Sequence, residues 1–134
     1  MTVPSGWTIY DFPKTIVKNK VGRDNQINAS EIKSSGKYPV IDQGQDYMAG
    51  YSDEKDKVFK PEQPLVIFGD HTRCFKYVDF PFIIGADGTK IITLNTTLFN
   101  PKFFYFQLLN LNIPSRGYNR HFKLLKEQKM LCPV

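Results

Sequence analysis

Residues 64–92 read PLVIFGDHTRCFKYVDFPFIIGADGTKII, and this stretch contains three short apolar runs separated by two polar corners. Residues 65–68 and 82–84 are rich in β-branched and aromatic side chains, and residues 75–80 alternate apolar with polar side chains at period two. The corners are GDHTR at residues 69–73 and GADGT at residues 85–89. Glycine and aspartate at such positions favour tight turns. We therefore predict a short β-meander as the scaffold, with candidate functional residues in its corners.

The last third of the chain predicts two helices. Asn100 can cap the first helix, which is expected to run to about residue 111, and Pro101 fits its first position. A second, short basic helix is expected over residues 120–128. The side chains expected to face inward are Phe103, Phe106, Leu108 and Leu109 in the first helix and Phe122, Leu124 and Leu125 in the second. We therefore predict an α+β fold: a twisted, mostly antiparallel sheet with a few short flanking helices, in one domain over residues 1–134.

The composition favours an ordinary globular protein. A chain of 134 residues is long enough to bury a core without disulfides or a metal, and 11 Phe and 7 Tyr argue against disorder. No apolar stretch has the length needed to cross a bilayer, and the amino terminus lacks the basic and apolar regions of a secretory signal. We therefore expect a cytoplasmic protein in which Cys74 and Cys132 are free thiols.

The net charge is concentrated at the carboxyl-terminal end. Residues 1–101 carry twelve Lys plus Arg and twelve Asp plus Glu, which cancel. Residues 102–134 carry six basic residues and one acidic residue, so the whole formal charge of +5 lies there. A basic segment of this kind attracts a phosphate backbone, although a basic helix face is often only solvated surface. The distribution favours nucleic acid as the partner.

Catalytic patterns are weak in this sequence. A nucleotide-dependent enzyme needs a glycine-rich turn between strand and helix, and none of the nine glycines forms one. Two histidines and two scattered cysteines make a poor zinc site. A small metal-dependent nuclease that uses Asp70, His71 and His121 is an alternative. The more frequent role of such residues is structural, with Asp70 capping a turn and His71 bonding locally.

Side chains suited to DNA recognition lie at loop ends and in one basic run. Arginine pairs with guanine, glutamine and asparagine pair with adenine, and lysine binds phosphate. The candidate DNA-binding residues are Gln43, Gln45, His71, Thr72, Arg73, Lys76, Lys90, Arg116, Tyr118, Asn119, Arg120, His121 and Lys123. We expect the corner at residues 71–73 to help choose the sequence and the run at residues 116–123 to grip phosphates.

Several short motifs stand in a fixed order along nearly the whole chain. They are VPSGW at residues 3–7, YPVIDQG at 38–44, AGY at 49–51, GDHTR at 69–73, Phe82 followed by GADG at 85–88, GYNRHFK at 117–123, and Pro133. In this order, the motifs resemble a target recognition domain from the specificity subunit of type I restriction-modification enzymes.

The resemblance implies a cytoplasmic module that reads one half of a bipartite double-stranded DNA target and has no catalysis of its own. Its implied partners are methyltransferase subunits and, through them, restriction subunits. S-adenosylmethionine, ATP and magnesium belong to those partners, so no cofactor is expected in this chain.

The sequence departs from the family pattern at its end. It stops at Val134, where the family continues into a long spacer helix, so we expect either an excised domain or a half-subunit. A decoy that binds the methyltransferase subunit is a further alternative.

Overall fold

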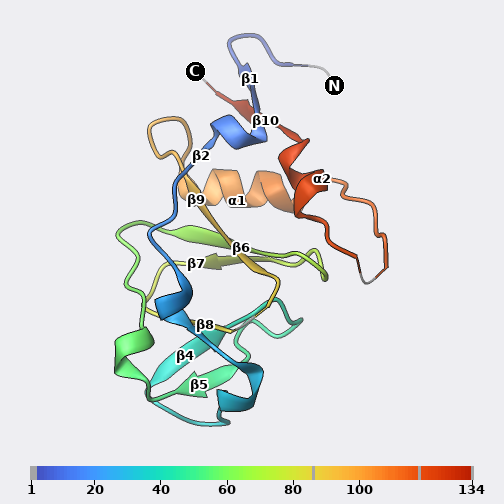
Figure 1. Cartoon of the computed structure of the whole chain (residues 1–134). Helices are drawn as coiled ribbons and strands as arrows, with labels where there is room; N and C mark the ends of the chain where they lie inside the picture. The colour runs from blue at the N-terminus through green and yellow to red at the C-terminus, as the bar shows by residue number, and fades with distance from the viewer. Residues whose placement is uncertain (1–2, 86, 118, 134) are drawn as a thin grey trace.

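The structure is a computed structural model that describes residues 3–85, 87–117 and 119–133 (Figure 1). The described residues form short strands, two short α-helices and single 3-10 turns that are joined by loops, which confirms the predicted α+β class. The strands are β1 (Thr8–Asp11), β2 (Ile16–Val17), β3 (Gln26–Ile27), β4 (Tyr38–Ile41), β5 (Gly50–Ser52), β6 (Leu65–Gly69), β7 (Phe75–Val78), β8 (Ile83–Gly85), β9 (Thr89–Leu94) and β10 (Lys129–Cys132). The α-helices are α1 (Pro101–Leu109) and α2 (Phe122–Lys126), and the 3-10 turns are η1 (Phe12–Lys14), η2 (Arg23–Asn25), η3 (Ala29–Glu31) and η4 (Lys55–Lys57).

The central sheet has the order β2-β9-β6-β7, and all its strands are antiparallel to their neighbours. All five residues of β6 are buried. Because successive side chains of a strand point to opposite faces, Val66 and Phe68 enter the core beneath the helices, whereas Leu65 and Ile67 enter a second core on the other face. The predicted strands at 65–68 and 75–80 therefore form a hairpin at the centre of the fold.

The third strand of the predicted meander lies elsewhere, so the meander was wrong. β8 joins the lower sheet, whose order is β3-β8-β4-β5 and in which β8 runs parallel to β3 and β4. Pro81 lacks an N–H for pairing with β7, and Phe82 instead exchanges backbone hydrogen bonds with Phe59 at 2.8 and 3.0 Å. β8 is buried throughout, as suits an inner parallel strand. The strands are mostly antiparallel, as predicted, but they form three sheets.

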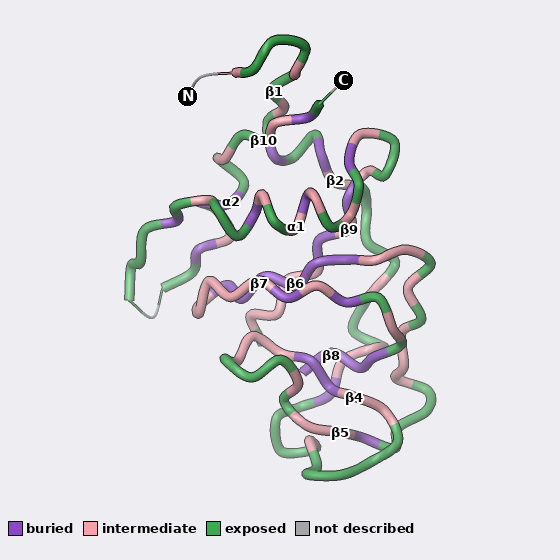
Figure 2. Tube along the Cα trace, turned by 180° about the vertical axis from the view of Figure 1, so that it is seen from behind, coloured by how far each residue is buried: buried purple, intermediate pink, exposed green. Residues whose placement is uncertain are grey.

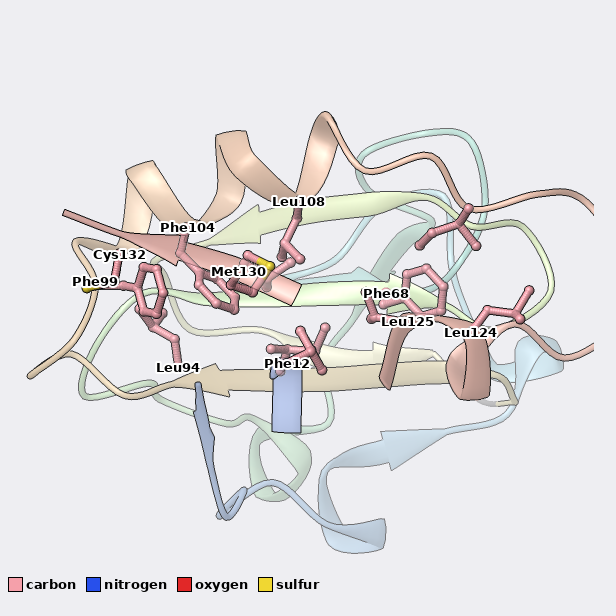
Figure 3. Packing of buried hydrophobic residues seen from close by; sticks show 13 residues of the cluster. Phe12, Phe68, Leu94, Phe99, Phe104, Leu108, Leu124, Leu125, Met130 and Cys132 are labelled. Atoms are coloured by element: carbon pink, nitrogen blue, oxygen red, sulfur yellow. The ribbon is translucent and has the colours of Figure 1, made fainter. Parts of the chain in front are cut away.

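The two ends of the chain lie side by side. β1 and β10 form a separate antiparallel pair in which Asp11 stands opposite Lys129, and the two side chains form an ion pair at 2.6 Å (Figure 1). The core cluster that contains Val66 and Phe68 also includes side chains from η1, β10 and both helices, and Figure 3 shows Phe104, Leu108 and Met130 between α1 and the central sheet. The predicted helices thus cover one face of the central sheet.

Helix α1 begins as predicted but faces the core with a stripe that differs in part from the predicted one. The Asn100 side chain accepts hydrogen bonds from the N–H groups of Lys102 and Phe103 at 3.0 and 3.3 Å. Phe104 and Leu108 are buried, and the exposed residues are Phe106 at 55% and Leu109 at 48%. The prediction was right for Leu108 and wrong for Phe106 and Leu109, because apolar side chains surround this helix and periodicity alone then selects no face.

Helix α2 is shorter than predicted, but its inward residues are as expected. Leu124 and Leu125 are buried, and the half-buried Phe122 lies 6.3 Å from Phe68 between ring centres. No helix among the described residues is long and apolar enough to span a membrane.

Truncating one buried and one exposed phenylalanine of α1 tests which side of the helix faces the core. Phe104→Ala should lower the free energy of unfolding by about 3–5 kcal/mol, because it leaves a cavity in the core. Phe106→Ala, the matched exposed control, should change it by less than about 1 kcal/mol. Urea denaturation of both variants measures the difference, and equal losses would contradict the observed orientation.

Candidate nucleic-acid interface

Four loops meet at one edge of the molecule, which we call the loop edge. They are the β4–β5 loop (42–49), the β6–β7 turn (70–74), the turn before β9 that contains Asp87 and Gly88, and the segment between the helices (110–121). In Figure 1 the β4–β5 loop, the β6–β7 turn and the segment between the helices extend to the right, and in the reverse view of Figure 2 they extend to the left, where the segment between the helices is mostly exposed. The loops come from both four-stranded sheets and from the helical layer, so tertiary contacts must hold them together.

Gln43 joins three of the four loops. Its side-chain oxygen accepts a hydrogen bond from the His71 N–H at 2.9 Å, and its amide nitrogen donates to the Asp87 carbonyl at 3.0 Å. The Gln43 carbonyl also accepts from the Thr72 hydroxyl at 2.6 Å. The carboxamide of Gln43 is therefore engaged inside the protein.

Glycines in the two corners make room for Gln43. A Cβ added at Gly69 would collide with the Thr72 hydroxyl, and one added at Gly88 would collide with the Gln43 amide. Gly88 also has a φ of +71°, a conformation that favours glycine. Both glycines thus permit close approach of the loops.

Asp70 joins the β6–β7 turn to helix α2. The residue is 1% exposed, and its carboxylate accepts hydrogen bonds from the N–H groups of His121 and Phe122 at 2.9 and 2.8 Å. An Arg120 nitrogen lies 3.5 Å from the other carboxylate oxygen. The Asp70 N–H donates to the Gly88 carbonyl at 2.8 Å. A buried charge is stable only when it is paired and hydrogen-bonded, and these contacts supply both conditions.

His121 is fully buried, and both of its ring nitrogens are engaged. Nδ1 lies 2.9 Å from the Asp70 carbonyl, which can only accept, so Nδ1 carries a hydrogen. Nε2 accepts a hydrogen bond from the Arg116 N–H at 3.0 Å. These bonds require the neutral Nδ1–H tautomer. The ring has no free nitrogen to act as a base, which tells against a nuclease built on Asp70, His71 and His121.

Two further candidates form internal bonds. Arg73, at a φ of 64°, donates from its guanidinium to the Ile113 carbonyl at 2.6 Å. The Lys76 ammonium donates to the carbonyls of Asp42 and Asp46 at 2.7 and 2.6 Å, and Lys76 is only 5% exposed. Burial lowers the pKa of Lys76, and the nearby Asp42 carboxylate opposes that shift. Lys76 therefore anchors the β4–β5 loop, and Arg73 anchors the segment between the helices.

The remaining described candidates lie in the loop edge or next to it, in β9 and α2. Lys90 extends over the ring of Phe122, with its Nζ 5.7 Å from the ring centre, and Lys126 does the same at 5.2 Å. Tyr118 lies outside the described residues. The exposed candidates are Gln45, Arg116, Asn119, Arg120 and Lys123, and the half-buried ones are His71, Thr72 and Lys90.

Most of the candidates that the sequence selected lie in the loop edge or next to it, but the sequence did not predict their internal contacts. It assigned Asp70 to a local turn or a nuclease, whereas the carboxylate caps a helix about fifty residues further along. One signal was available, because a charged residue that directly follows five apolar or small strand residues is placed where burial is expected. The groups that bond to the Asp70 carboxylate are distant in the sequence, so no local sequence pattern identifies them.

Substitutions of His121 separate its two hydrogen bonds. His121→Gln can keep an acceptor toward the Arg116 N–H, whereas His121→Asn can keep a donor toward the Asp70 carbonyl. Each variant should lower the free energy of unfolding by about 1–3 kcal/mol, because one buried partner loses its bond. Amide hydrogen exchange at Arg116 should be faster in His121→Asn than in His121→Gln, and the reverse order would contradict the assigned tautomer.

Comparison with known proteins agrees with this architecture. No protein-family model matches the chain. A type I restriction enzyme specificity subunit of Escherichia coli is 25% identical in an alignment of 114 residues that covers 80% of this chain and 28% of that subunit. The chain thus spans less than a third of the length of this curated relative.

Two solved structures share the fold over 99% of this chain and 39% of their own chains. The crystal structure of the HsdS subunit from Thermoanaerobacter tengcongensis superposes with a TM-score of 0.55 at 11% identity. A chain from a study of complex assembly and conformational transition in the type I restriction-modification system superposes with a TM-score of 0.56 at 12% identity. The predicted resemblance to a target recognition domain of type I restriction-modification specificity subunits is confirmed in sequence by the E. coli relative and in fold by these two structures.

Proposed function

We propose that this chain binds duplex DNA in a sequence-specific manner, as the target recognition domain of a type I specificity subunit. The observation that carries the proposal is the loop edge, where four loops are bonded to one another and present the basic segment of the chain. Similarity to a specificity subunit supports it independently. Loops held by rigid strands suit recognition, because bound side chains must keep their positions.

The basic side chains at the loop edge would hold the phosphate backbone. Arg116 and Lys123 are exposed, and the Arg120 side chain remains 75% exposed although it pairs with Asp70. Lys90 and Lys126 extend this positive surface across Phe122. Contacts of this kind bind any DNA sequence and weaken as the salt concentration rises.

The β4–β5 loop and the β6–β7 turn would read bases. His71 and Thr72 are half-buried at the turn, and Asp70 links the turn to the basic segment. Phosphate binding and base reading would therefore depend on one rigid frame of bonded loops and strands. Within that frame we assign positioning roles to the residues whose side chains are spent on internal bonds, which are Gln43, Arg73, Lys76 and His121.

We propose that residues 1–134 act as one recognition domain that reads one half of a bipartite target. Its partners would be methyltransferase subunits and, through them, restriction subunits. The chain would be non-catalytic and hold no cofactor, with S-adenosylmethionine, ATP and magnesium bound by those partners. A cytoplasmic location follows from this role.

Salt titrations test the proposed phosphate contacts. Lys123→Ala should weaken binding to every duplex and lower the slope of log affinity against log salt by about 1, because one counterion fewer is released. Lys55→Ala removes the same charge from η4, away from the loop edge, and should leave the slope unchanged. Fluorescence anisotropy with a short duplex measures both variants, and equal slopes for Lys123→Ala and wild type would count against the proposal.

Selection from random duplexes tests sequence specificity. The wild-type chain at low salt should enrich duplexes that share one short sequence. Enrichment of no common sequence over repeated rounds would overturn the proposed function.

A further inference from the structure

The β4–β5 loop carries an amide side chain that the internal bonds leave free. Two glutamines lie in the three loops that Gln43 joins, namely Gln43 and Gln45. Gln45 is exposed and forms no hydrogen bond with any residue that the structure describes. Its carboxamide offers one donor and one acceptor side by side, the pattern that pairs with N6 and N7 of adenine in the major groove.

A buried cation holds the loop on both sides of Gln45. The Lys76 ammonium donates to the carbonyls of Asp42 and Asp46, and a carboxylate oxygen of Asp42 lies 4.0 Å away. Burying an ammonium is unfavourable unless its donors are used. An apolar side chain at this position would avoid the desolvation of an ammonium group. A buried lysine is therefore best explained by its hydrogen bonds, which hold the β4–β5 loop in place.

Further bonds, one within the loop and two to neighbouring elements, fix the same loop. The Gly44 N–H donates to the Asp42 carboxylate at 2.8 Å, and the Tyr47 hydroxyl donates to the Tyr77 carbonyl. The Thr72 hydroxyl holds the Gln43 carbonyl. Residues on each side of Gln45 are therefore anchored to β7 or to the β6–β7 turn, and Gln45 stands at a preorganised tip.

We infer that Gln45 determines specificity by reading an adenine, and that Lys76 is the positioning residue for its loop. This inference rests on the proposed function, and it separates two glutamines that the sequence treats alike. Gln43 shapes the surface from within, whereas Gln45 contacts the DNA.

Selection from random duplexes with Gln45 variants tests the reading role. Gln45→Ala should lose about 5- to 150-fold discrimination for adenine at one position of the selected sequence. Gln45→Glu should favour cytosine there, because a carboxylate accepts from the cytosine N4 amine. Gln63→Ala, whose amide donates to Leu94 in the central sheet away from the loop edge, should retain the wild-type preference.

The Lys76 role is tested with Lys76→Met, which keeps an unbranched side chain and removes the ammonium. Discrimination at the Gln45 position should fall, while affinity for random-sequence duplex at low salt stays within about twofold, because the exposed basic segment is intact. Lys60→Met at an exposed site is the matched control. If Lys76→Met does not fold, Tyr47→Phe loosens the loop from its exposed side and should also lower discrimination.

The outcomes distinguish a failure of the proposed function from a failure of this inference. A wild-type chain that selects no sequence overturns the proposed function and this inference with it. A wild-type chain that selects a sequence, with the same sequence selected by Gln45→Ala and Gln45→Glu, overturns the inference alone. An unchanged preference in a folded Lys76→Met variant, or in Tyr47→Phe where it replaces that variant, overturns the positioning role.

Discussion

The burial of the Asp70 carboxylate is the constraint on which the loop edge depends. A charged residue that is 1% exposed needs hydrogen-bond donors within the protein, and Asp70 finds them at the start of α2. That requirement brings the start of α2, together with the basic run at residues 116–123, against the β6–β7 turn. The neutral His121 ring then extends the connection to Arg116. One buried carboxylate thereby fixes the basic segment relative to the strands.

Polar residues at the loop edge divide into those that hold loops and those that face solvent. Gln43, Lys76 and His121 spend their polar atoms on backbone groups of neighbouring loops. Gln45 and Lys123 remain exposed on the elements that these bonds position. The division accounts for how short loops without regular secondary structure keep a defined shape, since each loop is bonded to a strand or to another loop.

The relation to the solved HsdS structures has a similar physical basis. A fold can persist at 11% identity because it requires only that apolar side chains occupy the buried positions of the sheets and helices. Surface loops carry no such requirement, so their side chains are free to differ between proteins of one fold. In this chain, the proposed specificity accordingly resides in the loop that carries Gln45, and the shared architecture supplies its support.

The sequence by itself determined the elements whose signals are local: the β6–β7 hairpin, the capped start of α1, the inward residues of α2 and the carboxyl-terminal concentration of positive charge. Tertiary structure decided the placement of β8, because Pro81 and a partner strand forty residues earlier direct it away from β7. It also decided which stripe of α1 is buried, since apolar residues surround that helix. Finally, it decided that Gln43 is internal and Gln45 exposed. Residue type indicates what a side chain can bind, but only long-range packing determines whether protein or solvent is there to bind it.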